Sequence, residues 1–180
     1  QPMVDALSAR FHQPVGTWSP GERFVLPPAE RTGTMVLNDV GALGAPGAID
    51  AVAGNGVAVC LMHMRGTPAT MQSAPEYADV VAEVRGFLEA RARACEAAGI
   101  ARDRIVVDPG FGFGKTLAHN LDLLARLDEI AASGYPVLAG LSRKSMLGAI
   151  TGRPEGECMA AGCAAALSAV QRGAAIVRVH

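Results

Sequence analysis

From residue 34 onward, short continuous apolar runs alternate with amphipathic helical stretches, and this alternation constrains the fold more than any other feature. The apolar runs predict five strands, at residues 34–39, 56–64, 105–107, 135–142 and 174–180. The stretches between them predict four helices, near residues 46–53, 77–99, 120–134 and 157–173, with Asn120 as the N-cap of the third. The runs lack the alternating polar face of an open antiparallel sheet, so both faces of the sheet should be covered. Repeated strand–helix units of this kind predict an α/β fold with a parallel sheet and right-handed crossovers.

Residues 1–35 do not follow this pattern. A short strand could occupy Pro14–Trp18, but the pair Pro27-Pro28 would break any helix placed after it. We therefore expect a divergent, irregular or poorly packed N-terminal segment within a single domain that spans residues 1–180.

Composition narrows the class of protein. The 180 residues are half apolar, and the net charge of −1 comes from acids and bases interspersed along the chain, which argues against nucleic-acid and anionic-membrane partners. No apolar run approaches the roughly 20 residues of a membrane span, and the first ten residues form at most an amphipathic helix and not a signal peptide. The four cysteines contain no C-x-x-C pair and are interpreted as buried thiols of a reducing compartment. The sequence thus predicts a soluble, cytoplasmic protein.

Polar side chains gather where the predicted strands end. These positions are Asn38, Asp39, His63, Asp108, Ser142, Arg143, Lys144, Arg178 and His180. Active sites of parallel α/β folds lie at the carboxyl ends of the strands, whether the sheet is open or closed. The sequence therefore predicts a functional site at this edge of the sheet.

The stretch Arg104–Asn120, RIVVDPGFGFGKTLAHN, looks at first like a phosphate-binding loop. The P-loop pattern needs a glycine where Pro109 stands, and the dinucleotide fingerprint needs one where Lys115 stands. Asp108 could instead hold a guanidine-like or aminopyrimidine ring edge through two N–H groups. It could also be a turn former that caps the next helix. Lys115 either reaches back over the strand ends or is solvated.

The other charged candidates are cationic. Ser142, Arg143 and Lys144 together could bind an anion or a polar ring, although an exposed Arg-Lys pair would have the same sequence. Arg178 and His180 share one face of the last strand and could bind a phosphate group, or they could form a salt bridge inside a barrel.

His63 lies between two methionines and is interpreted as a satisfied core residue rather than a ligand. It has no acidic partner at ligand spacing, so we do not expect a metal site built by the protein. No serine or cysteine is identified as a nucleophile with a base beside it.

Taken together, these motifs resemble one family, the dihydropteroate synthases. The matching segments are NDVGAL at 38–43, LMHMRGTPATMQ at 61–72, DPGFGFGKTLAHN at 108–120, GLSRKSMLG at 140–148 and IVRVH at 176–180. The resemblance implies a parallel (β/α) barrel of the TIM type, incomplete here with about five to six of the eight strands. It also implies a transferase of folate biosynthesis (EC 2.5.1.15), which condenses 7,8-dihydropterin-6-ylmethyl diphosphate with 4-aminobenzoate to give 7,8-dihydropteroate and diphosphate.

The resemblance also implies which residues bind the pterin. Asn38, Asp108 and Lys144 would hold the ring, and Met62 and Gly140 would line its slot. Lys144 is in addition one of the expected catalytic residues.

The second substrate and the leaving group are assigned in the same way. Phe113 would lie near 4-aminobenzoate, whose carboxylate would approach Ser142 and Arg143, where sulfonamides compete. Arg178 and His180 would bind the diphosphate with the help of Mg²⁺ and are the other expected catalytic residues. The family also implies a homodimer.

The chain departs from the family pattern at its start and its end. The first two strands and a GGESTRPG-like loop are missing, and PVGTWSP stands without an acidic residue where the third strand should carry one. The chain ends at His180, before the terminal helix of the family. We therefore keep two hypotheses: a dihydropteroate synthase, or a non-catalytic paralogue or fragment that retains part of the pterin-binding site.

Overall fold

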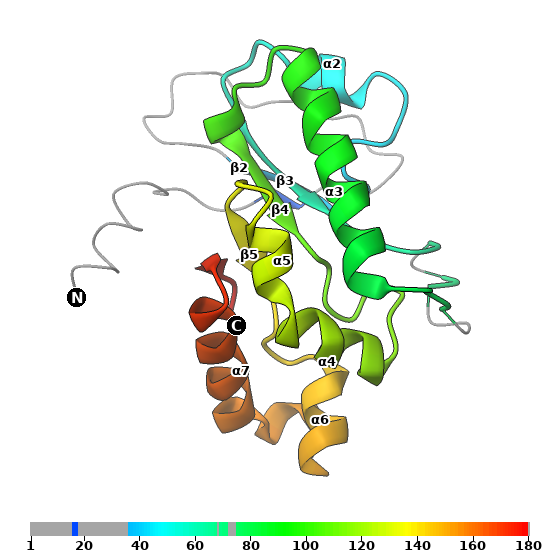
Figure 1. Ribbon diagram of the computed structural model, residues 1–180, viewed down its shortest axis with the longest axis vertical. Coiled ribbons are helices and arrows are strands. Elements are labelled where there is room, and N and C mark those ends of the chain that lie inside the picture. Colours follow the sequence, from blue (N-terminus) through cyan, green and yellow to red (C-terminus); the bar gives the residue numbers. More distant parts are fainter. Residues whose placement is uncertain (1–15, 18–35, 68, 72–74, 180) are drawn as a thin grey trace, which may run out of the picture.

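The computed structural model describes residues 16–17, 36–67, 69–71 and 75–179 (Figure 1). Of the strand predicted at Pro14–Trp18, Gly16–Thr17 falls within these ranges and forms strand β1. The rest of the N-terminal segment that was expected to be irregular lies outside the described residues.

Within the described residues, six strands form one parallel sheet, and their order in the sheet follows the chain, β1-β2-β3-β4-β5-β6. After β1 they are β2 (Val36–Asp39), β3 (Ala58–Met62), β4 (Ile105–Asp108), β5 (Val137–Ala139) and β6 (Ala174–Val177). The five strands predicted after residue 34 are therefore confirmed. Four of them end at or directly before the polar residues that the sequence places there, and β5 ends at Ala139, three residues before Ser142.

Helices connect the strands. They are α2 (Ala48–Val52), α3 (Val80–Ala97), α4 (Leu117–Ala125), α5 (Leu127–Ala131), α6 (Ser145–Thr151) and α7 (Met159–Gln171). The helix α6 was not predicted, because its 7 residues are too few to establish a helical period.

The prediction of one helix over 120–134 with Asn120 as its N-cap is wrong. The segment is divided at Arg126 into α4 and α5, and α4 begins three residues earlier than predicted. The true N-cap is Thr116, whose hydroxyl accepts a hydrogen bond from the backbone N–H of His119, while the His119 ring accepts one from the Thr116 N–H. A histidine completes this capping box where glutamate or glutamine is usual, so the sequence signal was missed.

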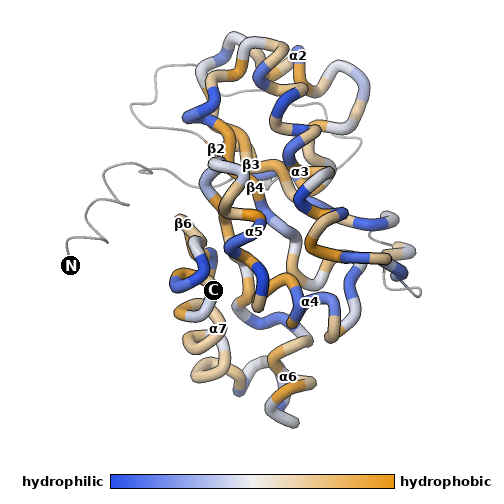
Figure 2. Tube along the Cα trace, viewed as in Figure 1, coloured by the Kyte–Doolittle hydropathy of each residue, from blue (hydrophilic) through white to orange (hydrophobic). Residues whose placement is uncertain are grey.

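The two faces of the sheet bury very different amounts of apolar surface. Alternate strand residues such as Leu61 and Val107 join the buried residues of the helices in one large core. The opposite face carries a small cluster made by strands alone, which we call the inner cluster: Val36, Cys60, Val106, Leu138 and Ile176. Figure 2 shows the apolar strands passing behind α3, whose colour alternates between hydrophilic and hydrophobic along its length.

The order of the strands explains this asymmetry. Crossovers of one hand that always step in the same direction place every helix on the same side of the sheet, whereas a reversal of strand order would place helices on both sides. A sheet wound in one direction curls around its inner face, as in a TIM barrel. The fold is therefore an incomplete parallel (β/α) barrel. No helix within the described part of the chain is both long and apolar enough to cross a membrane.

Candidate active site

The predicted site lies at the carboxyl ends of β2 to β6, on the inner face. Met62 and Asp108 are the last residues of β3 and β4 and are directly paired in the sheet register. Each lies two residues beyond a member of the inner cluster, so its side chain points to the same inner face. Asn38 on β2 follows Val36 in the same way. All three side chains are buried.

The two oxygens of the Asp108 carboxylate have different roles. Oδ1 accepts a hydrogen bond of 2.7 Å from the backbone N–H of Gly110, as expected of a turn former. Oδ2 is buried and has no hydrogen-bond partner among the described residues. Its nearest cation is Arg178, with Nη2 at 3.7 Å. Burial raises the pKa of Asp108, although the Gly110 N–H and Arg178 oppose this shift. The turn-former interpretation therefore describes one oxygen, but its prediction that Asp108 caps the next helix is wrong, because the N-cap of α4 is Thr116. The other oxygen is available to a ligand.

Asn38 presents a second acceptor of this kind. Its Oδ1 is also buried without a hydrogen-bond partner in the described part of the chain. A buried polar atom left unpaired costs about 1–3 kcal/mol, so native structures rarely keep one without a reason. Two such acceptors on one inner face fit a ligand that offers several N–H donors, as an aminopyrimidine ring does.

Two cations complete the inner face. The backbone N–H of Arg178 continues the β5–β6 pairing by donating to the Ala139 carbonyl at 3.1 Å. Its guanidinium lies across Gly140, where an added Cβ would come within 2.7 Å of Nη2. Lys144 places Nζ 4.3 Å from the centre of the Phe113 ring. Burial lowers the pKa of Lys144, and the neighbouring positive charge of Arg178 lowers it further.

The structure thus brings together Met62, Asp108, Phe113, Gly140, Lys144 and Arg178. The salt-bridge alternative for Arg178 is also realised here, as the long ion pair with Asp108. Ser142 and Arg143 lie in the turn before α6, where Ser142 is half-buried and Arg143 is exposed with a positive φ of 54°. Their role beside a substrate carboxylate stays a prediction. His180 lies outside the described residues.

Sequence reasoning left the place of Lys115 open and missed Tyr77 and Asn120. Lys115 is buried and reaches back to His63, which is itself buried and satisfied, as predicted. Asn120 accepts a hydrogen bond from Gly112 N–H at 2.8 Å, and the Tyr77 hydroxyl donates to the Gly114 carbonyl at 2.8 Å. No local pattern signals the Tyr77 contact, because its partner lies 37 residues away.

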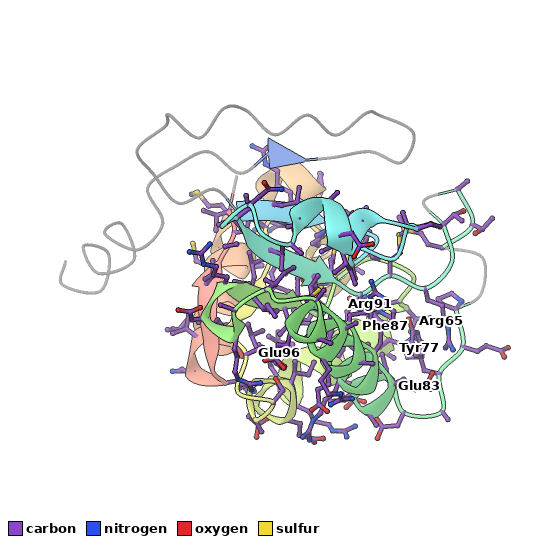
Figure 3. All side chains as sticks on the ribbon, turned by 90° about the horizontal axis from the view of Figure 1, so that it is seen from above. Arg65, Tyr77, Glu83, Phe87, Arg91 and Glu96 are labelled. Carbon is purple, nitrogen blue, oxygen red and sulfur yellow. The ribbon has the colours of Figure 1, made fainter. Side chains whose placement is uncertain are left out.

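A cluster around Tyr77 anchors the loop after β3 to the start of α3. Figure 3 shows Arg65, Tyr77, Phe87 and Glu83 gathered on one side of the molecule. The guanidinium of Arg65 lies 4.2 Å from the Tyr77 ring centre, and its Nη2 is 3.1 Å from Glu83 Oε2. The Tyr77 hydroxyl, at the end of this cluster, thus reaches the glycine-rich loop from a fixed base.

Among the described residues, no group of three or more histidine, cysteine, aspartate or glutamate side chains could hold an ion. The inner face instead combines one buried carboxylate with two cations. Such a face can bind a polar ring at Asp108 and an anionic group at Arg178.

Comparison with known proteins identifies relatives of the chain. Residues 2–180 match the family described as "Pterin binding enzyme". The dihydropteroate synthase of Escherichia coli (strain K12) is 47% identical over 182 residues, which cover 99% of this chain and 63% of that protein. The chain therefore spans less than two thirds of the length of this relative.

Solved structures of dihydropteroate synthases resemble this chain in both sequence and fold. Dihydropteroate synthase from Stenotrophomonas maltophilia, with imidazole bound in its active site, is 56% identical with a TM-score of 0.78; the match covers 81% of this chain and 55% of that one. The enzyme from Xanthomonas albilineans in complex with 7,8-dihydropteroate is 52% identical with a TM-score of 0.74, over 81% of this chain and 53% of that one.

Proposed function

The chain belongs to the family of pterin binding enzymes, and we propose that the whole protein is a dihydropteroate synthase. In this proposal it joins 7,8-dihydropterin-6-ylmethyl diphosphate to 4-aminobenzoate and releases diphosphate. The observation that carries the proposal is a pair of buried acceptors on the inner face that have no hydrogen-bond partner among the described residues, Asn38 Oδ1 and Asp108 Oδ2. Two cations, Lys144 and Arg178, act on the Asp108 carboxylate. The relatives named above support the choice of reaction.

Each group has a chemical task in this proposal. The Asp108 carboxylate and the Asn38 carbonyl accept N–H groups of the aminopyrimidine edge of the pterin. Lys144 donates to the acceptor atoms of the ring, and Met62 and Gly140 line the slot. A correctly turned Asp108 fixes the ring so that its methylene carbon faces the second substrate.

The reaction then needs stabilisation of charge rather than a nucleophile from the protein. The amine of 4-aminobenzoate forms a bond to the methylene carbon, the bond from that carbon to the diphosphate oxygen breaks, and the amine loses a proton. Negative charge grows on the departing diphosphate, where the Arg178 guanidinium, and His180 in our proposal, offset it. Phe113, Ser142 and Arg143 would hold the aminobenzoate.

Magnesium enters the proposal through the substrate. In the described ranges, no group of three or more histidine, cysteine, aspartate or glutamate side chains could hold an ion. In this proposal the oxygens of the diphosphate would supply ligands for Mg²⁺. The protein would contribute the cations that flank the diphosphate.

Two further properties belong to the proposal. A homodimer is supported by large apolar side chains left exposed on α6 and α7, namely Ile150, Met159, Leu167 and Val170. A cytoplasmic location is supported by the state of the cysteines, since all four are free thiols.

Calorimetry with 7,8-dihydropteroate tests the proposal directly. Wild-type protein should bind it, and Asp108→Asn should abolish binding, because the amide replaces one required acceptor with a donor. Asp122→Asn, at a half-exposed ion pair on α4, is the matched control and should bind normally. A folded wild-type protein that does not bind would refute the pterin site. Binding without release of diphosphate from the two substrates would favour the alternative of a non-catalytic relative.

A further inference from the structure

Lys115 is a buried lysine that makes contact with two strand-end loops at once. The chain contains two lysines, and the other is Lys144. Lys115 is only 4% exposed. Its Nζ lies 3.0 Å from the carbonyls of Gly110 and Phe113 and 3.0 Å from the His63 ring nitrogen Nδ1. The His63 carbonyl lies 3.4 Å away.

These contacts leave the ammonium group no hydrogen for a ligand. An ammonium has three hydrogens, and three acceptors stand at 3.0 Å. His63 can act as an acceptor because burial and the charge of Lys115 lower its pKa to about 3, which leaves the ring neutral. Lys115 therefore acts on the site through the protein and does not touch a substrate.

The two loops that Lys115 joins are in direct backbone contact. Gly110 and Gly114 both have positive φ, and a Cβ on either would overlap the backbone carbonyl of His63 or Arg65, respectively. The Tyr77 hydroxyl adds a bond to the Gly114 carbonyl. One loop follows Met62 and the other follows Asp108, so the joined loops carry both residues that end β3 and β4.

Resting on the proposed function, we propose that Lys115 is a positioning residue that locks these two loops together and thereby sets the places of Asp108 and Phe113 in the substrate site. Asp108 lies two residues before Gly110, which it contacts through Oδ1, and Phe113 carries one of the bonded carbonyls. Loss of the ammonium would leave the carbonyls of Gly110 and Phe113 without this donor. The turn that orients the Asp108 carboxylate would then loosen.

The charge of Lys115 makes this device sensitive to pH. Burial lowers its pKa to about 7; Asp108 opposes the shift and Lys144 adds to it. His63 stays neutral in this range, because burial and the positive charges of Lys115 and Arg65 lower its pKa to about 3. As the pH rises through about 7, Lys115 loses its proton and with it one bond to a loop carbonyl. Affinity for the pterin should therefore fall over this range through Lys115.

The test uses Lys115→Met in the full-length protein, because methionine fills similar space without charge or donors. Arg85→Met on α3, which removes a cation paired with Glu89 on the surface, is the control. Lys115→Met should weaken binding of 7,8-dihydropteroate about tenfold or more, raise KM for both substrates more than it lowers kcat, and flatten the pH profile near 7. Lys115→Arg, which keeps the charge, should recover part of the affinity.

A second readout does not depend on the proposed function. In the ligand-free protein, Lys115→Met should shift the backbone amide NMR signals of Gly110, Phe113 and Gly114, and Arg85→Met should not. Unchanged signals, or unchanged affinity and pH profile in a variant that is merely less stable, would overturn the positioning role. Failure of the wild-type protein to bind 7,8-dihydropteroate would instead refute the proposed function.

Discussion

Gly140→Ala should damage the site by displacing Arg178 while leaving the fold nearly intact. The added Cβ would lie 2.7 Å from Nη2, 3.2 Å from Nε and 3.3 Å from Cζ of Arg178. An ordinary contact needs about 3.5 Å or more, so the guanidinium must move by about 0.8 Å or more. The backbone at Gly140 does not have the positive φ that would add strain.

The displacement of the Arg178 guanidinium determines how much stability and how much activity Gly140→Ala loses. Arg178 is the end of a flexible side chain that is about one third exposed, so the free energy of unfolding should fall by no more than about 1 kcal/mol. A group misplaced by about 1 Å can cost about 10²-fold in rate. Because Arg178 is proposed to face the leaving diphosphate, kcat should fall by about 10- to 100-fold.

Steady-state release of diphosphate and thermal unfolding measure the two effects separately. Gly86→Ala is the matched control, because nothing lies within 4 Å of a Cβ placed there in α3. It should leave kcat unchanged and stabilise the helix by about 0.5–1 kcal/mol. A Gly140→Ala enzyme with wild-type kcat would refute the argument. So would a loss of stability well beyond 1 kcal/mol, because it would mean that Arg178 cannot yield.

Three further predictions concern stability and reactivity. Burial raises the pKa of Asp108, so its ionisation disfavours the fold once the pH exceeds about 4, the pKa of an aspartate in the unfolded chain. In denaturant titrations of the ligand-free protein, Asp108→Asn should therefore gain stability relative to wild type as the pH rises from 3 to 7. A difference in free energy of unfolding that does not change with pH would contradict this. Cys163 is exposed and the other three cysteines are buried, so Cys163→Ser should remove the fast phase of thiol labelling; a fast phase that persists would place another thiol at the surface. Thr116→Ala should cost about 1 kcal/mol of unfolding free energy by removing the N-cap of α4, whereas the neighbouring exposed Ala118→Ser should change it little.

The strands and the inner-face polar groups were predictable because their signals are local. A continuous apolar run marks each strand, and alternation along a strand determines which of two neighbours, such as Asn38 or Asp39, faces inward. Asp39 accordingly serves the turn after β2, where its carboxylate accepts from the N–H groups of Gly41 and Leu43.

The loop contacts were not predictable in the same way. The position of Lys115 depends on carbonyls that only the folded glycine turns bring together, and the Tyr77 bond joins loops far apart in the chain. The start of α4 was misjudged because Asn120 has the side chain of a good N-cap. In the fold, that side chain is used to hold Gly112 N–H. The same side chain can cap a helix or hydrogen-bond a loop, and only the tertiary structure determines which of the two it does.

The residues that offer acceptors to a ligand and the residues that hold the loops have different roles in the site. Asn38 and Asp108 keep buried acceptors that no group in the described part of the chain satisfies, and each costs stability that a folded chain must recover elsewhere. The loops beside Asp108 recover some of it, since Lys115, Asn120 and Tyr77 satisfy their carbonyls and N–H groups. A loosely held loop would let the Asp108 carboxylate turn toward its own backbone or fully toward Arg178. The rigid loops therefore keep Oδ2 unpaired, and an unpaired Oδ2 is what a ligand with N–H donors requires.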